Sequence, residues 1–176
     1  QRFAELVDLL VQSAALEDDW SERRELLHRA AESSVEALRD LDRGIVLYEQ
    51  LIETDPGDEL ALSQLVDLYS EVGHWPSAVA ILRRQRAIAE AAHAEAEVCE
   101  LDHQIGLIQL DHLGDTLAAL QSFAAVLASA PTHPGALAAL HRVEQTQPAR
   151  APAARRIMAE AHRQQGDTDD HGHDGQ

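Results

Sequence analysis

The sequence is short of aromatic residues, and it has no lysine and no asparagine. Phe, Trp and Tyr make up 3% of the 176 residues, and all 14 basic residues are arginine. With 31 Asp and Glu, the formal net charge is −17. Nucleic-acid binding needs clustered basic side chains that neutralise phosphates, and anionic membranes attract basic segments. The charge therefore argues against a nucleic-acid binder and against docking on an anionic bilayer.

Cysteine and long apolar runs are equally scarce. Cys99 is the single cysteine, so the fold does not depend on an intramolecular disulfide. No run approaches the ~20 apolar residues of a membrane span, and the N-terminus lacks the layout of a signal peptide. We expect a cytoplasmic protein, and arginine without lysine or asparagine is typical of a GC-rich, bacterial genome.

The sequence does contain an internal double repeat. At an offset of 75, from position 48 to position 123, Tyr48 falls on Phe123 and Pro56 falls on Pro131. Many other apolar and small residues of the two copies also coincide at this offset. Each copy contains two shorter units, and the separation between the starts of successive units alternates between a shorter and a longer value. These starts are near Glu25, Glu59, Glu100 and Pro134.

The shorter unit resembles the tetratricopeptide repeat, a helix–turn–helix of about 34 residues. A small residue, Gly44, is followed by the aromatic Tyr48 and then by Pro56, and the resemblance covers residues 22–146. It implies an all-α fold, a right-handed superhelical solenoid of helix hairpins. The second unit departs from the pattern because it has no closing proline, and His28 stands where a large apolar residue is usual.

Helical periodicity and turn residues support the same fold without the family. We expect a repeat array over residues 1–165, followed by a disordered, acidic and His-containing tail over 166–176. The pattern predicts about nine helices, over 3–16, 21–39, 41–54, 58–72, 75–91, 94–113, 115–130, 134–146 and 151–165.

The first of these helices matches the second helix of a pair, yet no partner precedes it. Helix pairs in solenoids bury their apolar faces against neighbours. We therefore expect either a longer array that continues upstream, which we favour, or another subunit that covers the stripe. The possible stacking face consists of Phe3, Leu6, Val7 and Leu10.

Catalytic and metal-binding motifs are weak. The sequence has no HExxH, GxSxG, CxxC or phosphate-binding glycine loop, so we expect no enzyme activity. A di-iron site needs two Glu-x-x-His pairs on facing helices, and repeat equivalents in a solenoid do not face one another. The pairs in this sequence are Glu25/His28, Glu71/His74, Glu90/His93 and Glu100/His103. Cys99 and His103 offer two zinc ligands where a structural site needs four. We therefore expect no cofactor and no metal site, with weak ion binding by the tail as an open alternative.

The resemblance implies that the first helix of each pair lines a concave groove for a partner peptide. One subclass of the family holds a C-terminal carboxylate with Lys and Asn, and this chain has neither. The predicted groove residues are Arg29, Ser33, Glu36, Ser63, Gln64, Asp67, Ser70, Glu71, Gln104, Ile108, Asp111, His112 and Arg142.

The acidic members of this set favour a basic or neutral partner segment, and charge is concentrated accordingly. Residues 1–75 have a net charge of −12 and residues 76–176 have −5. The leading hypothesis is a protein–protein interaction scaffold without catalysis. The alternatives are an assembly module that oligomerises end to end through the first helix and, less favoured, a metal-binding helical protein.

Overall fold

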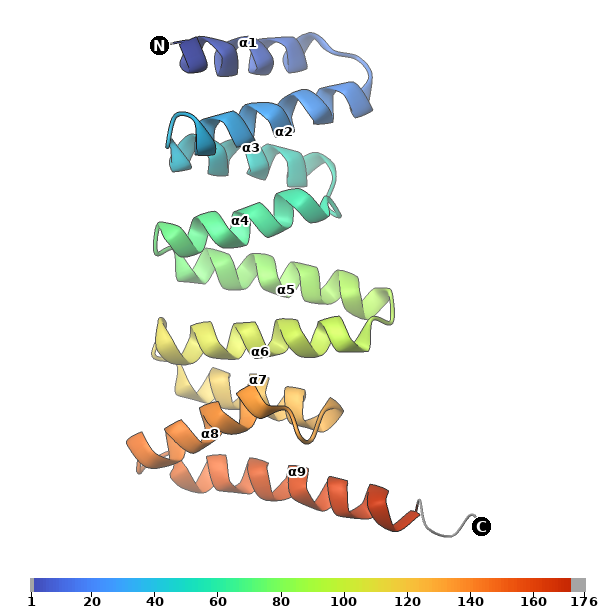
Figure 1. Ribbon diagram of the computed structural model, residues 1–176, viewed down its shortest axis with the longest axis vertical. Helices are drawn as coiled ribbons and strands as arrows, with labels where there is room; N and C mark the ends of the chain where they lie inside the picture. The colour runs from blue at the N-terminus through green and yellow to red at the C-terminus, as the bar shows by residue number, and fades with distance from the viewer. Residues whose placement is uncertain (1, 172–176) are drawn as a thin grey trace. The chain divides into compact units, whose positions relative to one another are not determined.

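The computed structural model describes residues 2–171, and within that range the chain is all-α, with nine helices and no strand (Figure 1). This confirms the predicted fold class, while the right-handed sense of a superhelix stays a prediction. The helices are α1 (Arg2–Leu16), α2 (Trp20–Glu36), α3 (Leu41–Thr54), α4 (Glu59–Glu71), α5 (Trp75–Ala91), α6 (Glu95–Asp111), α7 (Thr116–Ser129), α8 (Pro134–Thr146) and α9 (Ala151–His171).

Helix boundaries repeat with the period of the sequence. The three helices α6, α7 and α8 begin and end at the repeat equivalents of the first and last residues of α2, α3 and α4. A local sequence repeat therefore produces the same helices and the same turns twice. Positions related by the repeat offset can be compared directly as structural equivalents.

Aspartate side chains define where several helices begin. Asp40, Asp58 and Asp115 each accept a hydrogen bond from a backbone amide three residues later, at 3.0 Å. Such N-caps satisfy amide groups that have no partner inside the helix. These three aspartates are therefore the N-caps of α3, α4 and α7.

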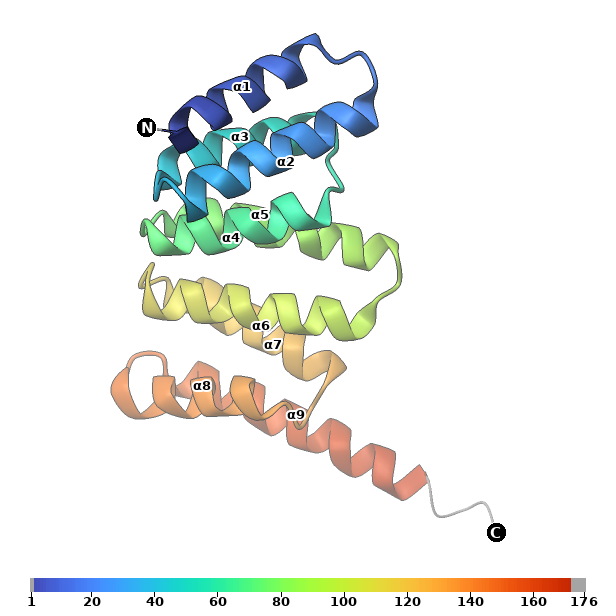
Figure 2. The same cartoon turned by 45° about the horizontal axis from the view of Figure 1, so that its top comes forward.

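The chain divides into two compact units, Gln1–Ile81 and Leu82–Gln176, and the division falls within α5. In the first unit, α2 and α4 lie in one layer, and α3 lies behind them in both views (Figures 1 and 2). The core of this unit is built from small and aliphatic residues together with two tyrosines, Tyr48 and Tyr69. Its buried members include Leu27, Ala30, Ala31, Ile45, Tyr48, Leu51, Leu62 and Leu65.

In the second unit, α6 packs on α7 around a ring that belongs to α7. Phe123 is fully buried, and a Cβ at Gly106 would lie 2.7 Å from its Cε1 atom. Glycine at this position therefore permits the close approach of the two helices. The surrounding core includes Cys99, Leu120, Leu127, Leu140, Val143 and Met158.

Two expectations about the ends of the chain need correction. Helix α9 continues to His171, so the helix does not end before Gly166, and residues 172–176 of the predicted tail lie outside the described range. On α1, Val7 and Leu10 are buried, because this helix packs against α2.

The remaining members of the predicted stacking face, Phe3 and Leu6, are exposed, at 55% and 39%, and Leu9 joins them at 59%. End-to-end assembly through α1 stays a prediction that now concerns these three side chains.

Among the helices that the structure describes, none combines the length and the apolar character of a membrane-spanning segment.

Candidate functional site

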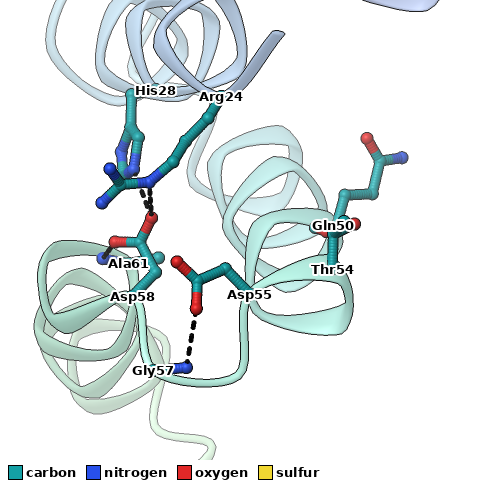
Figure 3. A network of polar contacts seen from close by, with 8 residues as sticks. All are labelled: Arg24, His28, Gln50, Thr54, Asp55, Gly57, Asp58 and Ala61. Carbon is teal, nitrogen blue, oxygen red and sulfur yellow. Dashed lines mark hydrogen bonds and ion pairs between the residues drawn. The ribbon is translucent and has the colours of Figure 1, made fainter. Parts of the chain in front are cut away.

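A buried carboxylate connects α2 to the start of α4 in the first unit. Asp58, 1% exposed, accepts hydrogen bonds at Oδ2 from Arg24 Nε at 2.7 Å and from His28 Nε2 at 2.8 Å (Figure 3). Its other oxygen, Oδ1, accepts from the Ala61 amide. One side chain thus caps α4 and fixes the position of α2 beside it.

The electrostatics of Asp58 follow from these contacts. Burial by itself would raise its pKa, but hydrogen bonds from Arg24, the Ala61 amide and His28 outweigh burial and lower the pKa to about 2. The carboxylate is therefore ionised at neutral pH. Charge-assisted hydrogen bonds of this kind are stronger than neutral ones.

A hollow of about 150 Å³ opens beside this network. Three helices contribute to it, and its wall combines apolar groups with hydrogen-bonding groups. The lining residues are His28, Glu32, Val35 and Glu36 from α2, Tyr48 from α3, and Leu60 and Gln64 from α4.

Tyr48, on α3, forms part of the lining of this hollow. Its side chain is 3% exposed and packs edge-on against His28, with ring centroids 6.0 Å apart. Burial, together with the carboxylates of Glu32 and Glu36, raises the pKa of Tyr48 to about 12. The hollow therefore contains a neutral phenol that is able to donate or accept a hydrogen bond.

Glu32 and Glu36 supply the negative charge of the hollow. They are one helical turn apart on α2, so both carboxylates lie on the same face. Both are exposed, and neither makes a hydrogen bond or ion pair within the described part of the chain. The carboxylates of Glu32 and Glu36 are thus available to bind a cationic ligand.

Of the predicted groove residues, the structure brings Glu36 and Gln64 together in this hollow. In the second unit it pairs two others, because Arg142 Nη2 lies 2.8 Å from Oδ1 and 3.0 Å from Oδ2 of Asp111. The remaining members are exposed or half-buried and line no part of the hollow: Arg29, Ser33, Ser63, Asp67, Ser70, Glu71, Gln104, Ile108 and His112.

Sequence reasoning missed most of the hollow. Glu32 was identifiable, since it precedes the predicted Glu36 by one turn of the same helix. Tyr48 and His28 were noted only as repeat positions, and nothing local in the sequence indicates that they meet. Their proximity depends on how α2, α3 and α4 pack.

Comparison with protein-family models, with curated proteins and with solved structures finds no match. The site therefore has to be interpreted from its own geometry and charge.

Proposed function

We propose that the first unit is a docking module for a basic segment of a protein partner, with an arginine side chain of that segment in the hollow between α2 and α4. The observation that carries the proposal is a hollow lined by Tyr48 and by two carboxylates, Glu32 and Glu36, that make no hydrogen bond or ion pair in the described part of the chain.

The chemistry of the wall favours a long cationic side chain. Val35 is half-buried and Leu60 is 54% exposed, so both offer apolar surface to methylene groups. Glu32 and Glu36 lie within the same lining and match the planar, multiply donating guanidinium group. Lysine supplies a point charge with fewer fixed donors, so we expect arginine to bind more tightly.

The net charge of the whole first unit also favours a cationic partner. Residues 1–81 contain 18 acidic and 6 basic residues, a net charge of −12. Such a field raises the encounter rate with a cationic partner and weakens with added salt. The resemblance to tetratricopeptide repeats supports the same face, because α2 and α4 are the first helices of consecutive units. A scaffold role without catalysis, in the cytoplasm, is part of this proposal.

Fluorescence anisotropy with short labelled peptides tests the proposal. The probes are an alanine-based peptide with several arginines, its arginine-to-lysine version and its arginine-to-glutamine version. We expect the arginine peptide to bind most tightly and the glutamine peptide to bind least. A Glu32→Gln, Glu36→Gln double variant should weaken arginine-peptide binding ~10-fold, since each charged hydrogen bond contributes ~1.5–3 kcal/mol in full and less at an exposed site.

The matched control is a Glu53→Gln, Glu59→Gln variant, which removes the same charge from exposed positions of the first unit outside the hollow. If the control loses as much affinity as the hollow variant, the attraction is merely general and the docking site is wrong. Equal binding of the arginine and lysine peptides would overturn the preference for a guanidinium group.

A further inference from the structure

Comparison of equivalent repeat positions shows that one residue of the buried network of the first unit is different in the second unit. At the repeat offset, His103 corresponds to His28, and His133 corresponds to Asp58. Both position 58 and position 133 are N-caps, of α4 and of α8. In the first unit the histidine meets a carboxylate, whereas in the second unit it meets another imidazole.

The two imidazoles of the second unit are closely opposed. Their ring centroids are 4.6 Å apart, and the planes are inclined by 55°. Glu100, one turn before His103 on α6, places Oε1 4.0 Å from His103 Nδ1. One ligand atom from each of the three side chains lies within 4.8 Å of the other two.

We propose that Glu100, His103 and His133 form a zinc site that joins α6 to the start of α8. Two imidazole nitrogens and a carboxylate oxygen are a donor set that zinc takes, with water in the fourth position. Ca²⁺ and Mg²⁺ prefer sites made of oxygen atoms, so the two imidazoles select against them.

Burial at His103 supports a ligand role. Its Nε2 atom is buried and has no hydrogen-bond partner of acceptable geometry in the described part of the chain. Burial, then the neighbouring His133, lower the pKa of His103, while Glu100 and the backbone of Gly135 act in the opposite direction.

Gly135 makes room for the site. A Cβ at this position would lie 2.5 Å from His103 Nε2 and 3.2 Å from His133 Cε1. Its equivalent in the first unit is Leu60, which has a full side chain. Beside the site, a hollow of about 380 Å³ lined by Cys99, Glu100, Ser129 and His133, among others, supplies a path for the ion.

The geometry needs a modest closure before zinc binds. Ligand atoms around tetrahedral zinc, bound at ~2.0–2.2 Å, lie ~3.4 Å apart. Glu100 is able to supply much of this movement because its side chain is 56% exposed. His133 also has to lose a hydrogen bond, because its Nδ1 accepts one from the Ala136 amide at 3.1 Å.

That loss is independent of which nitrogen of His133 takes the ion. If Nδ1 binds zinc, its lone pair is used, and if Nε2 binds, the proton of the neutral ring moves to Nδ1. Zinc binding therefore releases the α8 cap at Ala136. The site is expected to bind zinc with moderate rather than extreme affinity, and to leave a signature at one amide.

Isothermal titration with Zn²⁺ alone tests the site in the full chain. The parent for this experiment carries His171→Gln and His173→Gln, so that the tail histidines cannot contribute ligands. We expect one zinc ion per chain, a Tm that rises with zinc, and no competition from excess Mg²⁺. His103→Gln and His133→Asn should each weaken binding at least 10-fold, and asparagine at position 133 retains a capping side chain.

The matched control is His141→Gln, which removes an exposed histidine that lies 3.5 Å from a glutamate on the same helix. It should bind zinc as the parent does. Far-UV circular dichroism checks that each variant is helical, and Glu100→Gln supplies a variant at an exposed position should a histidine variant unfold. Unchanged zinc affinity in both the His133→Asn and Glu100→Gln variants would overturn the site.

A second readout distinguishes this site from binding elsewhere. Amide NMR should show a zinc-dependent shift of the Ala136 resonance that is absent in His133→Asn. Co²⁺ in place of Zn²⁺ should give the visible absorption of a tetrahedral site in the parent only. Zinc binding without a change at Ala136 would place the ion elsewhere and would also overturn the proposal.

Discussion

Arg39 and Gly114 occupy the same place in the two halves of the chain and have the same left-handed backbone, with φ of 57° and 65°. Each precedes the aspartate that caps the second helix of its pair, Asp40 or Asp115. Glycine adopts positive φ at little steric cost, whereas a residue with a Cβ is strained there. The repeat thus contains one well-matched turn and one strained turn of the same geometry.

We predict opposite effects of exchanging residues at these two turns. Arg39→Gly should raise the free energy of unfolding by ~0.5–1 kcal/mol, and Gly114→Ala should lower it by ~1 kcal/mol. Urea denaturation of each variant measures the difference. The control is Gly57→Ala, because Gly57 has no positive φ and a Cβ there meets only Asp55 Oδ1, at 3.7 Å. A loss of stability in Arg39→Gly would contradict the assignment of strain.

The packing of Gly106 against Phe123 predicts a destabilising effect of one methyl group. Gly106→Ala places its Cβ against a buried ring that has no room to move, so it should cost ~1–3 kcal/mol despite the better helix propensity of alanine. Gly166→Ala on α9 is the control, since nothing lies within 4 Å of its Cβ. Equal stability of the two variants would contradict the tight α6–α7 contact.

The buried Asp58 predicts a specific acid sensitivity. Its pKa is lowered from 3.8 to about 2 in the folded chain, so folding favours the ionised form. The stabilisation is fully present above about pH 4 and is lost as the pH falls towards 2, and it amounts to ~2 kcal/mol.

Asp58→Asn should therefore be less stable at neutral pH and should lose less stability than the wild type between pH 4 and 2. Thermal unfolding across this range measures the difference. Asp40→Asn, at an exposed cap, serves as the control and should keep the acid sensitivity of the wild type. The assignment fails if both variants show the same pH profile.

Two arginine–aspartate pairs of the second unit should differ in their contribution to stability because they differ in burial. Arg86 Nε lies 2.7 Å from Asp102, whose side chain is 12% exposed, while Arg142 pairs with Asp111, which is 39% exposed. Arg86→Met leaves a nearly buried carboxylate without its partner and should cost ~3 kcal/mol.

Arg142→Met should lower the free energy of unfolding by less than ~1 kcal/mol, and added salt should reduce this loss further. Chemical denaturation by urea at low and high salt compares the two variants directly. Equal costs at low salt would show that burial of Asp102 does not decide the strength of its ion pair.

Local features of the fold were predictable from the sequence. The bounds of α3, α5 and α8 and the capping roles of Asp40, Asp58 and Asp115 follow from periodicity and from side chains that act within one turn of the helix. The double repeat is likewise a property of the sequence, and the helix boundaries reproduce it.

Predictions that required knowledge of neighbouring helices fared less well. An apolar stripe on α1 was identified, but the sequence did not indicate that α2 would bury Val7 and Leu10 and leave Leu9 exposed. The polar composition after residue 165 suggested disorder, yet a polar segment is able to continue a helix, and α9 continues to His171.

The sequence by itself determined an acidic, all-helical chain, its double repeat and its turns, because each of these depends on residue types and on local spacing along the chain. Only the tertiary structure placed Tyr48 in the same hollow as Glu32 and Glu36, and His133 beside His103. These contacts join helices separated by loops, so they depend on the packing of whole helices against one another. The same two repeat positions therefore hold an aspartate–histidine contact in one unit and a pair of imidazoles in the other, and only packing shows what each pair can bind.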